Sequence, residues 1–67
     1  MAAIKGKVYT IATSSGVYRF ADLLEHPTHY SARQVLTGNR VGRMIHRISR
    51  SDIERATVTE EELHCNP

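Results

Sequence analysis

The segment from Asn39 to Arg50, NRVGRMIHRISR, carries the side chains best suited to binding chemistry. It holds four arginines and no acid in twelve positions. At about 100° per residue, the four apolar side chains between them fall within one arc of about 100°. Guanidinium groups make bidentate contacts to guanine and to phosphate. The spacing therefore predicts an amphipathic helix that presents an apolar face to the core and an arginine face to a polyanion.

The charges of the chain are arranged in blocks, although the net charge is only +2. Residues 1–19 sum to +3, residues 20–30 to −2, residues 31–50 to +5 and residues 51–67 to −4. Such asymmetry indicates a polyanion-binding surface, an acidic tail, or both. The acids of the last block could instead fold back on the arginine face, and the basic patch would then be structural.

Histidine and cysteine are the other residues with ligand chemistry. His26, His29, His64 and Cys65 would be the candidate ligands for zinc, but their spacing matches no familiar zinc pattern. We therefore expect no metal and no cofactor. His46 lies on the flank of the predicted arginine face, where its charge would respond to pH near neutrality.

No catalytic signature is visible in the sequence. A Gly-rich phosphate loop, an H-E-x-x-H motif and a G-x-S-x-G motif are all absent. We therefore expect a binding protein and not an enzyme. A single cysteine excludes an internal disulfide, and no apolar run approaches the roughly 18 residues that span a bilayer. These features predict a cytoplasmic protein with no membrane segment.

The remaining elements can be read from periodicity and capping residues. The stretch IKGKVYTIATSSGVYRF alternates in the manner of a β-hairpin, and SSG supplies its turn. FADLLEHP has the i, i+3, i+4 spacing of a short helix that ends before Pro27. Ser31 and Gln34 form a capping box for a helix over residues 32–37, and Gly38 suits the left-handed residue that closes it. A further short helix is expected near Asp52–Ala56.

Together these elements predict an α+β fold, with an N-terminal β-hairpin packed on three or four short helices. Residues 1–58 would form a single small domain, and residues 59–67 an acidic C-terminal tail.

The stretches SSGVYRFADLLEH and YSARQVLTGNRVGRMIHR resemble small helix-turn-helix DNA-binding modules of phages and mobile elements. The resemblance implies that the arginine-faced helix of a regulator binds nucleic acid, with duplex DNA favoured. Because a single short module makes few phosphate contacts, we expect the protein to act as a homodimer. The sequence departs from the motif at Gln34 and Thr37, where small or apolar residues usually pack. The predicted nucleic-acid-binding residues are Arg33, Asn39, Arg40, Arg43, His46, Arg47 and Arg50.

A protein partner is the alternative to nucleic acid. Small proteins with an exposed hairpin often bind by adding a strand to the sheet of a partner. Here the hairpin carries Tyr9 and Tyr18, which are residue types that favour interfaces. A phage-encoded inhibitor that binds a host protein through its hairpin and basic face would have such a sequence. The simpler explanation of both tyrosines is that they cover the core.

Overall fold

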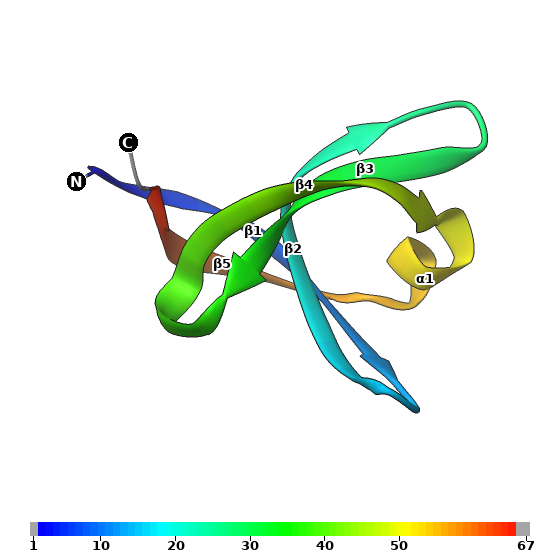
Figure 1. Ribbon diagram of the computed structural model, residues 1–67, viewed down its shortest axis with the longest axis horizontal. Coiled ribbons are helices and arrows are strands. Elements are labelled where there is room, and N and C mark those ends of the chain that lie inside the picture. Colours follow the sequence, from blue (N-terminus) through cyan, green and yellow to red (C-terminus); the bar gives the residue numbers. More distant parts are fainter. Residues whose placement is uncertain (1, 66–67) are drawn as a thin grey trace.

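The computed structural model describes residues 2–65, and it is built almost entirely of β-strands (Figure 1). The elements in chain order are β1 (Ala2–Thr13), β2 (Gly16–Glu25), β3 (His29–Leu36), the 3-10 helix η1 (Thr37–Asn39), β4 (Arg40–Ser49), α1 (Arg50–Arg55) and β5 (Thr57–Cys65).

The five strands close into a barrel. Strands β1 to β4 follow one another as an antiparallel meander, and β5 returns to pair with β1 along its whole length. The barrel closes between β4 and β5, which run parallel and share one paired position, Arg40 with His64. This pairing joins the ring of strands at one point and leaves the β4 edge beyond Arg40 without a strand partner among residues 2–65.

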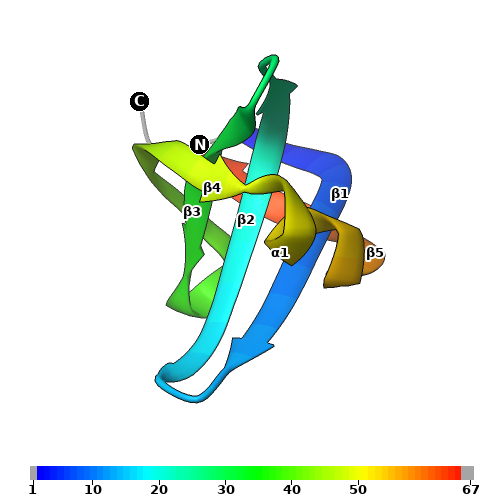
Figure 2. The same ribbon diagram turned by 90° about the vertical axis from the view of Figure 1, so that its right-hand side faces the viewer.

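Two clusters of buried side chains fill the barrel. Val8, Ala21, Val35 and Leu63 form one cluster, with Val8 and Ala21 fully buried. The other is formed by Ile11, Phe20, Ala32, Ile48 and Ile53. Ile53 comes from α1, so the short helix lies across one end of the barrel and supplies the apolar side chain that covers it (Figure 2).

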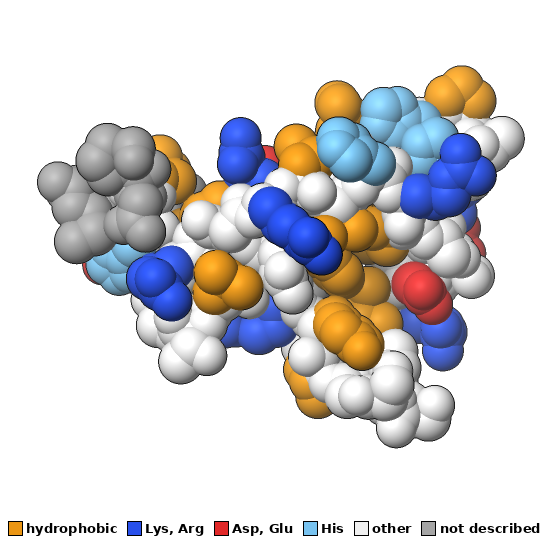
Figure 3. Space-filling view, viewed as in Figure 1, with side chains coloured by type: hydrophobic (Ala, Val, Ile, Leu, Met, Phe, Trp, Pro, Cys, Tyr) orange, Lys and Arg blue, Asp and Glu red, His pale blue; other side chains and the backbone are white. Residues whose placement is uncertain are grey.

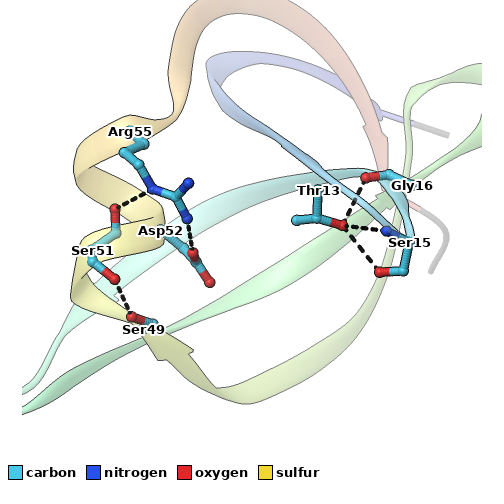
Figure 4. A network of polar contacts seen from close by, with 7 residues as sticks. All are labelled: Thr13, Ser15, Gly16, Ser49, Ser51, Asp52 and Arg55. Carbon is cyan, nitrogen blue, oxygen red and sulfur yellow. Dashed lines mark hydrogen bonds and ion pairs between the residues drawn. The ribbon is translucent and has the colours of Figure 1, made fainter.

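The predicted N-terminal hairpin is confirmed. β1 and β2 pair in register from Tyr9 with Phe20 to Thr13 with Gly16, so two residues make the turn. The Thr13 hydroxyl group lies 3.0 Å from the Gly16 carbonyl oxygen and accepts a hydrogen bond from the Ser15 amide at 3.2 Å (Figure 4). These local bonds stabilise the projecting end of the hairpin.

The predicted α+β fold and the helix-turn-helix are wrong. Three segments predicted as helices are strands: the end of β2, most of β3 and all of β4. The one α-helix among residues 2–65, α1, lies near the predicted Asp52–Ala56 segment. The described part of the chain consequently has no arginine-faced helix that could enter the major groove of a duplex.

Extra residues in β4 explain why its sequence has helical spacing. Between the pairs Tyr30–Ile48 and Ala32–Ile45, β3 advances two residues while β4 advances three. The same happens between Arg33–Met44 and Val35–Val41. Each irregularity adds one residue to β4, as a β-bulge does. The apolar residues of β4 that pack against the core are therefore three or four positions apart instead of two: Val41, Ile45 and Ile48.

A similar irregularity accounts for the wrong helix at FADLLEHP. Between the pairs Ala21–Arg33 and Leu24–Ser31, β2 advances three residues while β3 advances two. Asp22 has a φ of 53°, which aspartate tolerates better than most residues. The capping-box serine, Ser31, is buried within β3, and its hydroxyl group lies 2.7 Å from Nε2 of His26.

The acidic segment expected as a tail is part of the barrel. Residues 57–65 form β5, which lies beside the lysines of β1: Lys5 is opposite Glu62 and Lys7 is opposite Glu60. Opposite charges on paired strands attract each other. The basic first block and the acidic last block of the sequence thus lie on neighbouring strands, and the acids do not cover the basic segment around β4.

Candidate binding groove

A groove of about 440 Å³ lies between β4, α1 and the projecting end of the β1–β2 hairpin. Figure 3 shows hydrophobic side chains gathered in this hollow, with arginine or lysine and acidic side chains at its margins. Its lining residues are Ile11, Thr13, Ser15, Tyr18, Phe20, Gln34, Arg43, Ile45, Arg47, Ile48, Ser49 and Asp52. The volume lies within the roughly 300–1,000 Å³ that is usual for small-ligand sites.

The floor of the groove is continuous with the core. Ile11, Phe20 and Ile48 are all less than one-tenth exposed, and the half-buried Ile45 packs against the same cluster. A rigid apolar floor of this kind favours the flat face of a ring over a charged group, because charge is costly to bury.

The arginines that line the groove are Arg43 and Arg47 of β4, and both side chains are exposed. Within residues 2–65 neither makes an ion pair. Four other arginines do: Arg19 with Glu61, Arg33 with Asp22, Arg50 with Glu25, and Arg55 with Asp52. The positive charge beside the groove is therefore available to a ligand.

The hairpin contributes the aromatic wall. Tyr18 is 39% exposed, and its hydroxyl group lies 3.1 Å from the hydroxyl group of Ser15. Because that contact holds the tip of the ring, the ring has a defined position beside the groove. Tyr9, the other tyrosine of the hairpin, is half-buried and packs against the core, which is the simpler role expected for it.

The opposite wall is the first turn of α1. Figure 4 shows Asp52 between the helix and the hairpin turn, where it accepts a hydrogen bond of 2.5 Å from Nη2 of Arg55. Nε of Arg55 donates to the Ser51 carbonyl oxygen at 3.4 Å, which fixes the guanidinium group on the helix. Asp52 is the only carboxylate among the residues that line the groove.

The structure separates the predicted site residues into three sets. Arg43 and Arg47 line the groove, whereas Arg40 and His46 are exposed on β4 outside it. The others make contacts within the barrel. Arg33 donates to the Gly42 carbonyl oxygen at 3.4 Å and lies near Asp22.

Asn39 and Arg50 are held by structural contacts. The amide nitrogen of Asn39 donates to Oε1 of Glu61 and to the Glu62 carbonyl oxygen, both at 3.1 Å, which ties η1 to β5. Arg50 donates to Glu25 at 3.0 Å and lies over the Tyr30 ring, 5.1 Å from its centre. The hydrogen bond from Arg50 to Glu25 also raises the pKa of Arg50.

Two further ionisable groups outside the groove have shifted pKa values. Hydrogen bonds from Arg19, Thr59 and Asn39 lower the pKa of Glu61 to about 2. Desolvation, followed by the charges of His26 and Arg47, lowers the pKa of His29. The rings of His26 and His29 stack with their centres 4.6 Å apart.

Ten of the twelve lining residues were not among the predicted site residues, Tyr18, Phe20 and Asp52 among them. Tyr18 was expected at a protein interface or over the core, Phe20 in the hairpin or on a helix face, and Asp52 at a helix start. Their proximity to Arg43 depends on barrel closure, which brings β1, β2, β4 and α1 together. The local sequence around Tyr18, Phe20 and Asp52 gives no sign of that proximity.

The fold and the groove define a small β-barrel with one basic, aromatic and apolar-floored surface groove. No protein-family model, curated protein or solved structure matches the chain. In the described part of the chain, no helix is long and apolar enough to cross a membrane. Within residues 2–65, no three His, Cys, Asp or Glu side chains are grouped as metal ligands.

Proposed function

We propose that this protein binds a single-stranded nucleic acid in the groove between β4, α1 and the hairpin. The observation that carries the proposal is the position of Arg43 and Arg47, two arginines without an ion-pair partner among residues 2–65, beside an exposed tyrosine and an apolar floor. Proteins that bind single strands combine positive charge along the backbone with aromatic rings on which bases stack.

The β4 side and the α1 side of the groove differ in charge, and this difference would orient the bound strand. A base would stack on Tyr18 above the apolar floor, and the phosphates would lie near Arg43 and Arg47. The carboxylate of Asp52 would repel phosphate, so the backbone would run along β4 and not along α1. A duplex fits this groove poorly because its bases are stacked inside the helix and are not available to the ring.

Fluorescence anisotropy with a labelled oligonucleotide of about eight nucleotides tests the proposal, since single-strand sites span roughly 4–16 nucleotides. We expect binding at low salt, weaker binding to the duplex of the same sequence, and a loss of affinity in Tyr18→Ala of about five- to a hundredfold. Tyr18→Phe keeps the ring and is the matched control. No binding to any single strand at low salt would refute the proposal.

Two accompanying expectations belong to the same proposal. A single groove with two free arginines makes few phosphate contacts, so we propose that the protein acts as a homodimer, which light scattering of the complex would test. The single cysteine accords with a cytoplasmic location.

A protein partner at the seam between β4 and β5 is the second candidate. Those strands share one paired position among the described residues, so no strand of the chain covers the β4 edge beyond Arg40. An extended peptide can add to such an edge. Val17, at the nearby hairpin tip, is 65% exposed. A defined partner that is retained after nuclease treatment but lost by Val17→Glu would favour this function over nucleic-acid binding.

A further inference from the structure

We infer that the groove selects guanine among the bases of the bound strand, with Asp52 as the residue that recognises it. This inference rests on the proposed function, because it concerns the base that would stack on Tyr18. The positive charge and the Tyr18 ring alone would not determine which base binds there.

The carboxylate of Asp52 is suited to reading a base edge. It lies in the first turn of α1, lines the same groove as Tyr18, and is half-buried. One of its oxygens, Oδ1, accepts the hydrogen bond from Arg55, and no other residue among 2–65 donates a side-chain hydrogen bond to it. A carboxylate has about four acceptor sites and no donor. Asp52 therefore has acceptor capacity left for a ligand that offers N–H groups.

Guanine is the base that offers two such groups side by side. Its N1–H and N2–H donors are adjacent on the Watson–Crick edge and match the two oxygens of a carboxylate. Adenine and cytosine offer one amino group beside an acceptor nitrogen, and uracil offers one N–H between two carbonyl oxygens. Those acceptors would lie against the carboxylate and be repelled by it.

The groove also supplies a donor for the remaining polar atoms of guanine. Gln34 of β3 lines the same groove and is half-buried, and its side-chain amide can donate to the O6 acceptor. Asp52 on α1 and Gln34 on β3 thus supply an acceptor and a donor from different elements of the barrel. Such recognition discriminates between bases in two ways. The correct base makes the hydrogen bonds, and a wrong base leaves polar groups of the groove unpaired.

The experiment compares labelled uridine-rich RNA strands that differ at one central base. We expect the strand with guanine to bind about tenfold more tightly than strands with adenine, cytosine or uracil at that position. Inosine, which lacks the N2 amino group, should lose part of that advantage. Asp52→Asn should abolish the preference, so that the guanine and uridine strands bind this variant equally, because an amide offers both a donor and an acceptor.

Arg55→Ala is the matched control. It removes the ion pair on Asp52 without changing the carboxylate, so the preference for guanine should remain, and circular dichroism would verify that both variants are folded. Equal binding of all four strands would overturn the inference and leave the proposed function standing. A preference that persists in folded Asp52→Asn would also overturn it. If no strand binds, the proposed function and this inference both fail.

Discussion

Replacing Arg43 and Arg47 together by alanine should reduce the salt dependence of single-strand binding. Each phosphate contact to a single strand contributes about 0.7 to the slope of log K against log [salt], so losing two lowers the slope by about 1.4. Between roughly 50 and 200 mM salt, those two contacts correspond to about a sevenfold change in affinity. Anisotropy titrations at several salt concentrations measure the slope directly. Because both side chains are exposed, the barrel should remain folded.

Arg40→Ala is the matched control for that experiment. Arg40 lies on the same strand, is also exposed and carries the same charge, but it does not line the groove. Its removal should change the slope much less than the double replacement does. If wild type and the double variant have the same slope, the two arginines do not contact phosphate. If Arg40→Ala lowers the slope as much as either groove arginine, binding depends on general charge and not on the groove.

Three further predictions concern the barrel itself. Ile48→Ala should cost about 2–5 kcal/mol in the free energy of unfolding by urea, whereas Val58→Ala, at a residue 50% exposed, should cost less than about 0.5 kcal/mol. Gly42→Ala should cost about 1–3 kcal/mol in the same assay, because the added Cβ would lie 3.1 Å from the Leu36 side chain. The pKa of Glu61 is about 2 in the folded state against an ordinary 4.5, so its contribution to stability is present above pH 4.5 and is lost as the pH falls towards 2. Glu61→Gln should therefore flatten the fall of the melting temperature over that pH range, and an unchanged profile would mean that Glu61 is not held by its partners.

The parts of the fold that were predicted correctly depend on local backbone chemistry. The hairpin follows from alternating β-formers around SSG, and the strands do pair across that turn. Gly38 was expected to take a left-handed conformation, and its φ is 76°. The short helix near Asp52 follows from acidic residues and good helix formers that have little strand propensity. In each case the deciding interactions lie within a few residues of one another.

Two of the three wrong helices share a physical cause. An extra residue in a strand lengthens the spacing of its core-facing side chains, and in β4 the core-packed Val41, Ile45 and Ile48 lie four and three positions apart, which is helical spacing. Both β2 and β4 contain such irregularities, and both were predicted as helices. Gly42 was the local sign against a helix. A Cβ there would press on the Leu36 side chain and the Gln34 carbonyl oxygen, where β3 and β4 approach closely.

The basic block of residues 31–50 contains the arginines that line the groove, although the helix predicted for that segment was wrong. Strand pairing places the acids of β5 beside the lysines of β1, and the acids of residues 20–30 pair with Arg33 and Arg50. Each of these pairings removes a basic residue from the set available to a ligand. Arg43 and Arg47 of β4, which line the groove, have no ion-pair partner among residues 2–65. Which basic residues remain available to a ligand depends on the positions of the acids and not on the periodicity of the segment. The conclusion would therefore be the same for a helix as for a bulged strand.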